Sequence, residues 1–208
     1  MLQMTKAGHR DDRPPDMPSD NPARQNIQVL YNAEDDVLPN EWQPTDVQLT
    51  QWVAAAYGAI AGSSAEADQV EVSVSAVSGQ QIQVLNREYR GKDSPTNVLS
   101  FESGMPPLPQ ERDDASVTND ASVTNDASVM VVLGDIVVCP EILRFEAIEQ
   151  GKSIEDHWAH MVVHSVLHLK GLDHTNDQSA DTMESLEIRI LSNLGISNPY
   201  LDTPASQS

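Results

Sequence analysis

A chain of 208 residues, of which 39% are apolar, is long enough for one globular domain with tails. A transmembrane helix is not expected, because no window approaches about 18 consecutive apolar residues. The formal net charge of −20 argues against general affinity for nucleic acid, including DNA, because such affinity comes mainly from neutralising phosphates. The single cysteine, Cys139, cannot form an internal disulfide, and the N-terminus lacks a secretory signal pattern, so we expect a cytoplasmic protein.

The first half of the chain predicts a tail followed by alternating strands and helices. Residues 1–25 are rich in Pro, Asp and Arg, show no hydrophobic periodicity and are expected to be disordered. The elements expected after this tail are a strand at 27–32, a helix from Thr45 or Asp46 to Gly62, a strictly alternating strand at 70–77, a short helix at 79–91 and a strand at 97–103.

Residues 104–129 predict a low-complexity insertion in a loop. The hexapeptide DASVTN repeats in tandem from Asp114, and six residues are too few for a solenoid unit. We interpret the repeat as an expansion in a surface loop, because lengthening a loop costs little closure entropy. A calcium-binding tract is the alternative, although the glycines that such a tract needs are missing.

The second half of the chain predicts one strand and three helices. The stretch VMVVLGDIVVCP indicates a buried strand in which Cys139 is a buried small residue rather than a reactive thiol. Helices are expected from Pro140 to Gly151, from Ser153 to Gly171 and from Ser179 to Leu194, with a flexible tail at 201–208. This order predicts an α+β domain at residues 26–200, with a single mixed β-sheet of about four strands covered by helices.

Four of the six histidines fall within HMVVHSVLHLKGLDH. His160, His164 and His168 are four residues apart on one helix face, so only an adjacent pair can bind one ion about 2 Å from each nitrogen. Gly171 selects the second pair, because a glycine there can end the helix in a left-handed turn and return His174 to the same ion. His164, His168 and His174 are therefore the predicted Zn²⁺ ligands, at the end of a long central helix, with a fourth position open for water.

The remaining histidines and the basic residues leave alternatives open. His160 is expected behind the ligands or in the core, and His157 is expected to be exposed. The alternative to a metal site is a helix whose histidines are ordinary core residues.

Arg87, Arg90 and Lys92 form a local basic cluster. This cluster is either an ordinary solvated helix end or a patch for an anionic partner.

The metal motif resembles that of a known family. HSVLHLKGLDH is similar to the H-G-x-L-H-L-x-G-Y-D-H motif of the YbeY family, the bacterial single-strand endoribonucleases of ribosomal RNA maturation. LNREYRGKDSPTNVLSF resembles the family's other signature, LGDIVVCPE its central strand, and HWAHMVVH the approach to the zinc helix. The similarity covers about residues 27–200 without the repeat insertion. Ser165, Leu172 and Asn97 depart from the usual Gly, Tyr and Asp, but none of them is a predicted ligand.

The resemblance implies an enzyme that cleaves single-stranded RNA with one zinc ion per chain. It singles out Arg90 as needed for activity, and a guanidinium can bind two oxygens of the phosphorane that forms during RNA cleavage. Arg87 and Lys92 are then expected to bind substrate. The expected role is maturation of the 3′ end of small-subunit ribosomal RNA and ribosome quality control, with the ribosome or its proteins as partners. The nucleophile that attacks the phosphate is either a water molecule or a ribose hydroxyl.

Two alternatives to a ribonuclease come from the same residues. The ligand spacing is shared with the HExxHxxGxxH zinc peptidases, but Ser165 stands where their Glu acts as general base, and a hydroxyl cannot take that proton at neutral pH. The other alternative is a non-catalytic ribosome assembly factor with a structural zinc.

Overall fold

The computed structural model describes residues 26–33, 42–60, 69–104, 130–173 and 176–201. Within these ranges the chain forms four strands and five helices, in the order that the sequence predicts. The strands are β1 (Asn26–Ala33), β2 (Gln69–Ala76), β3 (Val98–Glu102) and β4 (Met130–Val138), and the helices are α1 (Asp46–Ile60), α2 (Gly79–Arg90), α3 (Pro140–Glu149), α4 (Ile154–Leu169) and α5 (Asp177–Asn193).

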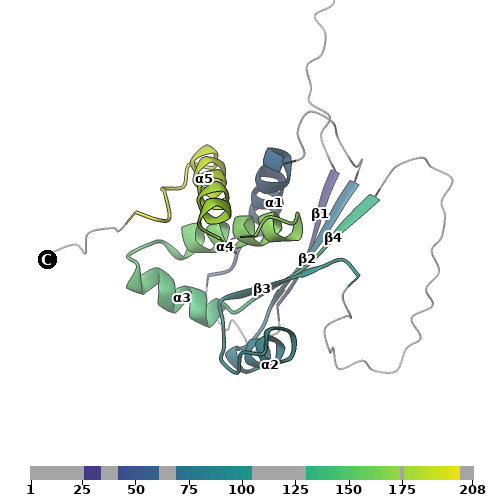
Figure 1. Cartoon of the computed structure of the whole chain (residues 1–208), viewed down its shortest axis with the longest axis vertical. Helices are drawn as coiled ribbons and strands as arrows, with labels where there is room; N and C mark the ends of the chain where they lie inside the picture. The colour runs from purple at the N-terminus through teal and green to yellow at the C-terminus, as the bar shows by residue number, and fades with distance from the viewer. Residues whose placement is uncertain (1–25, 34–41, 61–68, 105–129, 174–175, 202–208) are drawn as a thin grey trace, which may run out of the picture.

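The strands form one mixed sheet in the order β1-β2-β4-β3 (Figure 1). β1 pairs with β2 and β2 pairs with β4 in parallel, whereas β3 pairs with β4 antiparallel. A parallel pair requires a crossover connection, and α1 lies between β1 and β2 in the chain. The α+β class and the mixed sheet of four strands are therefore confirmed.

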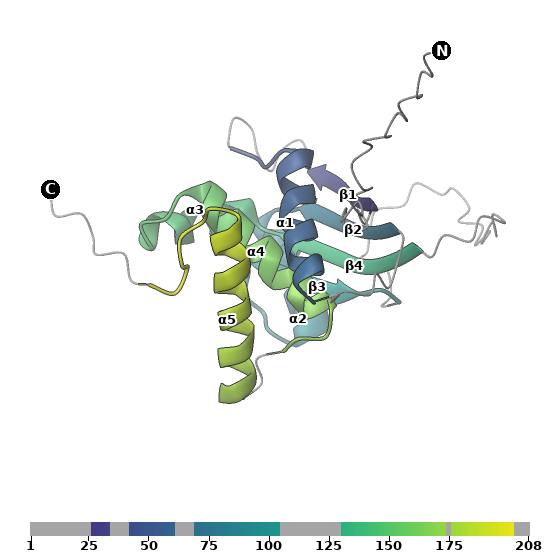
Figure 2. The same cartoon turned by 90° about the horizontal axis from the view of Figure 1, so that it is seen from above.

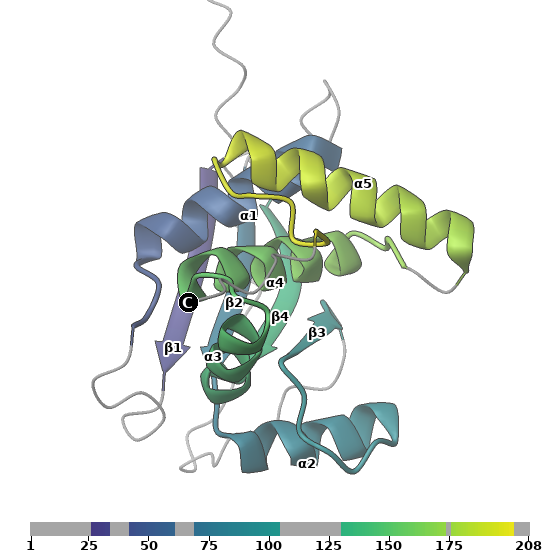
Figure 3. The ribbon, with the colours of Figure 1, turned by 90° about the vertical axis from the view of Figure 1, so that its left-hand side faces the viewer.

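Helices cover the sheet unequally. α1, α4 and α5 lie on one face, with α4 crossing the sheet beneath the other two (Figures 2 and 3). α4 contacts α1, α3, α5, β3 and β4 and is buried along most of its length, with Trp158, Val162 and Val166 fully inaccessible to solvent. The helix is therefore held firmly by its neighbours, which suits a site that needs fixed geometry.

β4 is buried on both faces over its C-terminal part, whereas Met130 and Val132 near its start are exposed. Ile136 and Val138 join the main core under α1, α4 and α5, whereas Val137 and Cys139 join a smaller core with Ile82 and other side chains of α2 and β3. This two-sided burial accounts for the continuous apolar run of the sequence in this strand. Cys139 is buried, as expected, and burial raises the pKa of its thiol.

A bulge in β4 brings the backbone of β3 very close. Gly134 has φ of 142°, and the pairing with β2 shifts register at this point. A Cβ atom on Gly134 would overlap the carbonyl oxygen of Phe101. Only glycine permits this approach of the two backbones. β3 also contacts α4.

Several predictions fall outside the described residues. The N-terminal tail at 1–25, residues 105–129 of the expected insertion, the C-terminal residues 202–208 and His174 all lie there. Among the helices that the structure describes, none is long and apolar enough to cross a membrane.

Candidate active site

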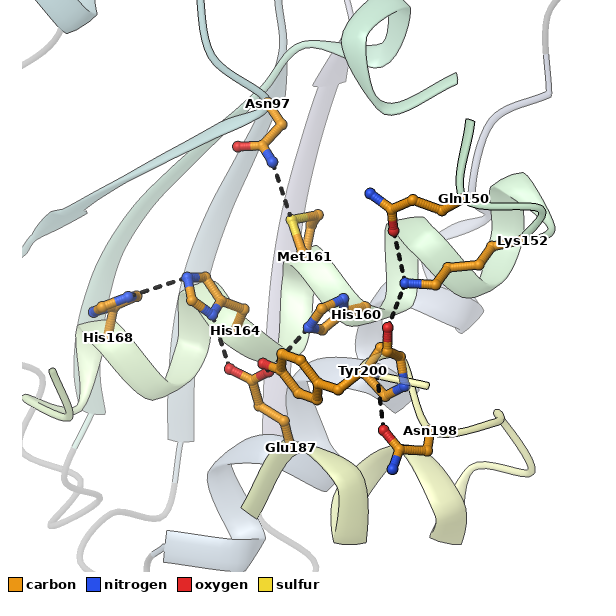
Figure 4. A network of polar contacts seen from close by, with 11 residues as sticks. Asn97, Gln150, Lys152, His160, Met161, His164, His168, Glu187, Asn198 and Tyr200 are labelled. Atoms are coloured by element: carbon orange, nitrogen blue, oxygen red, sulfur yellow. Dashed lines mark hydrogen bonds and ion pairs between the residues drawn. The ribbon is translucent and has the colours of Figure 1, made fainter. Parts of the chain in front are cut away.

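The last two turns of α4 bring two imidazoles together with their Nε2 atoms pointing at each other. The Nε2 atoms of His164 and His168 lie 3.1 Å apart, and Figure 4 shows both rings on the same side of the helix. Two nitrogen ligands of a tetrahedral zinc ion, each about 2.0–2.1 Å from the metal, are about 3.3 Å from each other. The two side chains therefore already have nearly the separation that a shared ion requires, and neutral imidazole is a suitable ligand for it.

A carboxylate on α5 sets the orientation of His164. Oε1 of Glu187 accepts a hydrogen bond of 2.8 Å from Nδ1 of His164, and Oε2 accepts one of 2.9 Å from Nε2 of His160. The Tyr200 hydroxyl also donates to Oε2 (Figure 4). Glu187 is 0% exposed, and its burial raises its pKa, but the hydrogen bonds from the two histidines and Tyr200 outweigh burial and lower the pKa to about 2.

The ionised carboxylate determines which nitrogen of His164 carries the proton. An ionised carboxylate only accepts hydrogen bonds, so Nδ1 of His164 must be the donor. In the neutral ring the lone pair then lies on Nε2, the atom that faces His168. A metal-binding histidine commonly has such a partner on its other nitrogen.

His160 lies behind the facing pair, as predicted. It is buried, its Nε2 is directed at Glu187 and its ring meets that of Tyr200 edge to face, with centroids 5.5 Å apart. Burial lowers the pKa of His160, and Glu187 partly opposes that shift. A buried residue engaged in this way is not positioned to share an ion with His168.

The end of α4 has the conformation that the sequence predicts. Gly171 has φ of 81° in the left-handed region, and its N–H donates to the His168 carbonyl at 2.8 Å. Beyond it Asp173 lines the same cleft as His164 and His168. His174 follows Asp173 directly but lies outside the described residues, so its part in the site stays a prediction.

The two histidines open onto a cleft of about 530 Å³. Arg90, the last residue of α2, lines this cleft although it is more than seventy positions away in the chain from His164. The polar side chains that line it with Arg90 and the histidines include Ser100, Glu102 and Asp173. One cationic group, two imidazoles and two carboxylates thus face a common space.

The other two bases of the predicted cluster do not line this cleft. Nη1 of Arg87 lies 3.6 Å from Oδ1 of Asp93 in an exposed ion pair. Lys92 follows the left-handed Gly91 that ends α2. A contribution of Arg87 and Lys92 to substrate binding stays a prediction for the surface outside the cleft.

The prediction that His157 is exposed is wrong. His157 is only 3% exposed, and its Nε2 forms a 2.8 Å hydrogen bond with Oε2 of Glu146 on α3. Nδ2 of Asn97 donates to the same carboxylate at 3.1 Å. Burial raises the pKa of Glu146, but these two hydrogen bonds outweigh it and the pKa lies below its usual value. The first turn of α4 was misjudged because the packing of α3 cannot be read from the periodicity of α4.

Glu187, Tyr200, Glu102 and Asp173 were missed by the sequence analysis. A signal existed for Glu187, because it lies between Met183 and Ile190 on the apolar face of α5, where a carboxylate must have partners. Tyr200 follows the last helix in an irregular segment and gave no periodic signal. Glu102 and Asp173 reach the cleft only through the arrangement of β3 and α4.

The fold and cleft define an α+β protein whose central helix presents paired imidazoles beside an arginine, a combination suited to a metal ion and an anionic substrate. A family model described as endoribonuclease YbeY matches residues 38–195. The chain is 42% identical over 159 residues to endoribonuclease YbeY from Colwellia psychrerythraea, covering 76% of this chain and 89% of that protein. It is 45% identical over 135 residues to endoribonuclease YbeY from Francisella philomiragia, covering 64% and 75% of the two chains.

A solution structure of a Thermotoga maritima protein matches 87% of this chain and 100% of its own, with a TM-score of 0.44 and 23% identity. The family match and the two relatives are decisive. The chain belongs to the endoribonuclease YbeY family, which confirms the resemblance found in its sequence.

Proposed function

We propose that this chain is a zinc-dependent endoribonuclease that cleaves single-stranded RNA during maturation of the 3′ end of small-subunit ribosomal RNA. The observation that carries the proposal is that Arg90 and the facing pair His164 and His168 line one cleft. Family membership supports the reaction class. The proposed role includes ribosome quality control, and the proposed site of action is the cytoplasm.

Each residue of the cleft has a specific task in the proposed reaction. His164, His168 and His174 hold the zinc ion, which when bound supplies Lewis-acid chemistry at a phosphate oxygen or a water molecule. Arg90 binds the non-bridging oxygens of the scissile phosphate and stabilises the charge that builds on them. Glu187 keeps the proton of His164 on Nδ1 and so leaves Nε2 as the ligand atom.

The charge of the cleft favours a flexible substrate that makes few phosphate contacts. Two acidic residues, Glu102 and Asp173, line the cleft together with the basic Arg90. The formal net charge of the whole chain is −20. A long stretch of phosphates is repelled by such a surface, whereas one phosphate can be accepted beside Arg90. A single strand can bend its backbone into the cleft, but the stacked and paired bases of a duplex oppose that bend. Ribosomal proteins are positively charged partners that can compensate for the acidic surface.

A peptidase is disfavoured by the position of Ser165. This residue occupies the place of the general base in the peptidase motif, and it is fully buried on the side of α4 that packs in the protein interior. Neither its pKa nor its location allows it to activate a water molecule for a substrate in the cleft.

The proposal is tested by incubating the full chain with a single-stranded precursor of small-subunit ribosomal RNA. We expect endonucleolytic cleavage that a chelator abolishes and added zinc restores. Casein serves as the control substrate and should stay intact. Zinc binding without cleavage of any RNA would favour an assembly factor with a structural zinc, and casein turnover would favour the peptidase.

A further inference from the structure

We propose that Tyr200 is a positioning residue of the metal site, through which the C-terminal segment Ile196–Leu201 sets the affinity for zinc. The described contacts of Tyr200 are its hydrogen bond to Glu187 and its ring contact with His160. Tyr200 acts through Glu187, whose carboxylate it shares with His164. The inference rests on the proposed function, because it assumes that His164 binds a metal ion.

The chain of contacts is continuous from the C-terminal segment to the ligand. The Tyr200 hydroxyl donates to Oε2 of Glu187, and Oε1 of the same carboxylate accepts from Nδ1 of His164 at 2.8 Å (Figure 4). His160 donates to Oε2 as well, at 2.9 Å. Both oxygens are therefore held from different directions, and the carboxylate plane cannot rotate without breaking at least one hydrogen bond.

The segment that carries Tyr200 is itself fastened to the domain. Nζ of Lys152, between α3 and α4, donates to the Pro199 carbonyl oxygen at 2.5 Å and to Oε1 of Gln150 at 2.6 Å. The N–H of Tyr200 donates to Oδ1 of Asn198 at 2.9 Å, which closes a local turn within the segment. Tyr200 is nonetheless 42% exposed, so the segment lies over the buried carboxylate as a surface layer rather than as part of the core.

Removal of the Tyr200 hydroxyl should weaken the ligand rather than the fold. Glu187 would keep its two histidine donors, but Oε2 would lose the donor that approaches from the C-terminal segment. Loss of a group bonded directly to a metal ligand, as Glu187 is to His164, typically costs about 10–100-fold in metal affinity. Tyr200 acts one hydrogen bond further away, so its loss should fall at the lower end of that range. Because coupling is reciprocal, zinc binding should in turn stabilise the C-terminal segment.

The experiment measures zinc affinity of the full chain by competition with a chromophoric chelator. The informative variant is Tyr200→Phe. The matched control is Tyr31→Phe, which removes a hydroxyl on β1 whose hydrogen bond within the described part of the chain is to the exposed side chain of Gln43. We expect Tyr200→Phe to bind zinc at least tenfold more weakly while its melting temperature without metal stays near that of the parent. Glu187→Gln should lose at least as much affinity, since an amide offers only one acceptor oxygen.

A second measurement tests reciprocity in the unmodified chain. Hydrogen exchange of the peptide that contains Tyr200 and Leu201 should slow when zinc is added. Equal zinc affinity of Tyr200→Phe, Tyr31→Phe and the parent, or unchanged exchange in the C-terminal peptide, would overturn the inference while leaving the zinc enzyme intact. A parent chain that binds no zinc would overturn the proposed function and this inference with it.

Discussion

The Nε2 atoms of His164 and His168 face each other at 3.1 Å, whereas Nε2 of His160, one turn earlier, is directed at Glu187. Three histidines at the same spacing on one helix thus have two different roles. The Glu187 carboxylate on α5 accounts for the difference between them. It binds Nδ1 of His164, which leaves Nε2 of that ring facing His168. In His160 it binds Nε2 instead.

The first prediction follows from this division. The purified chain should carry about one zinc ion, and His168→Ala should lose it because one ligand is removed. His160→Ala should retain most of the zinc with reduced affinity, since it removes only one of the donors to Glu187. Metal content is measured by atomic absorption after dialysis. If His160→Ala is the variant that empties the site, the choice of ligand pair is wrong.

Arg90→Ala should retain zinc and stability but lose RNA cleavage by about 3 kcal/mol, or roughly 100-fold, if the guanidinium acts as a donor to the transition state. Arg87→Ala is the control, because Arg87 lies outside the cleft in an exposed ion pair. Arg87→Ala should weaken RNA binding slightly and leave the rate of cleavage nearly unchanged. Single-turnover cleavage of a defined single strand distinguishes the two variants, and full activity of Arg90→Ala would refute its catalytic role.

Salt dependence measures how many phosphates the acidic chain can neutralise. We expect about two to three, which gives a slope near −2 in a plot of log affinity against log salt for single-stranded RNA. Matched duplex RNA should be a poor substrate. A slope near −6 would require a broad basic surface, which is inconsistent with a net charge of −20. Equal cleavage of duplex would remove the preference for single strands.

Two glycines should respond in opposite ways to the same change. Gly134→Ala forces a Cβ atom into the carbonyl oxygen of Phe101 at a residue with positive φ, so it should destabilise the fold by more than about 1 kcal/mol. Gly58→Ala lies in an α1 turn with open space around it and should stabilise by about 0.5–1 kcal/mol. Urea denaturation of both variants measures the difference, and equal effects would contradict the close approach of β3.

Glu146 should stabilise the fold near neutral pH and lose that effect in acid. Its pKa in the folded chain is below the ordinary value of 4.5, so the stabilisation is present above that pH and declines as the pH falls through the folded pKa. The parent should therefore exceed Glu146→Gln in free energy of unfolding at pH 7, and the gap should narrow below about pH 4. Glu149→Gln, on the exposed surface of α3, is the control. A gap that is independent of pH would contradict the hydrogen bonds of Glu146 with His157 and Asn97.

The sequence alone was sufficient for the elements and for the helix that carries the paired histidines. Strand alternation, helix periodicity and caps are local properties, so the range 70–77 predicted one strand within a residue of the observed β2, and Gly171 ended α4 in the predicted left-handed turn. The relative positions of His164 and His168 follow from helix geometry in the same way. The family resemblance then singled out Arg90, which periodicity could not do.

Only the tertiary structure decided which residues meet across elements. Arg90 reaches the histidine cleft because α2 packs against β3 and β3 in turn contacts α4, and Gly134 lets the backbones of β3 and β4 approach closely. Glu187 and Tyr200 join His164 through the packing of α5 and the C-terminal segment on α4. Such contacts depend on the relative placement of segments that are far apart in the chain. A sequence pattern reports the periodicity within one segment, and the packing of the whole core determines which segments become neighbours.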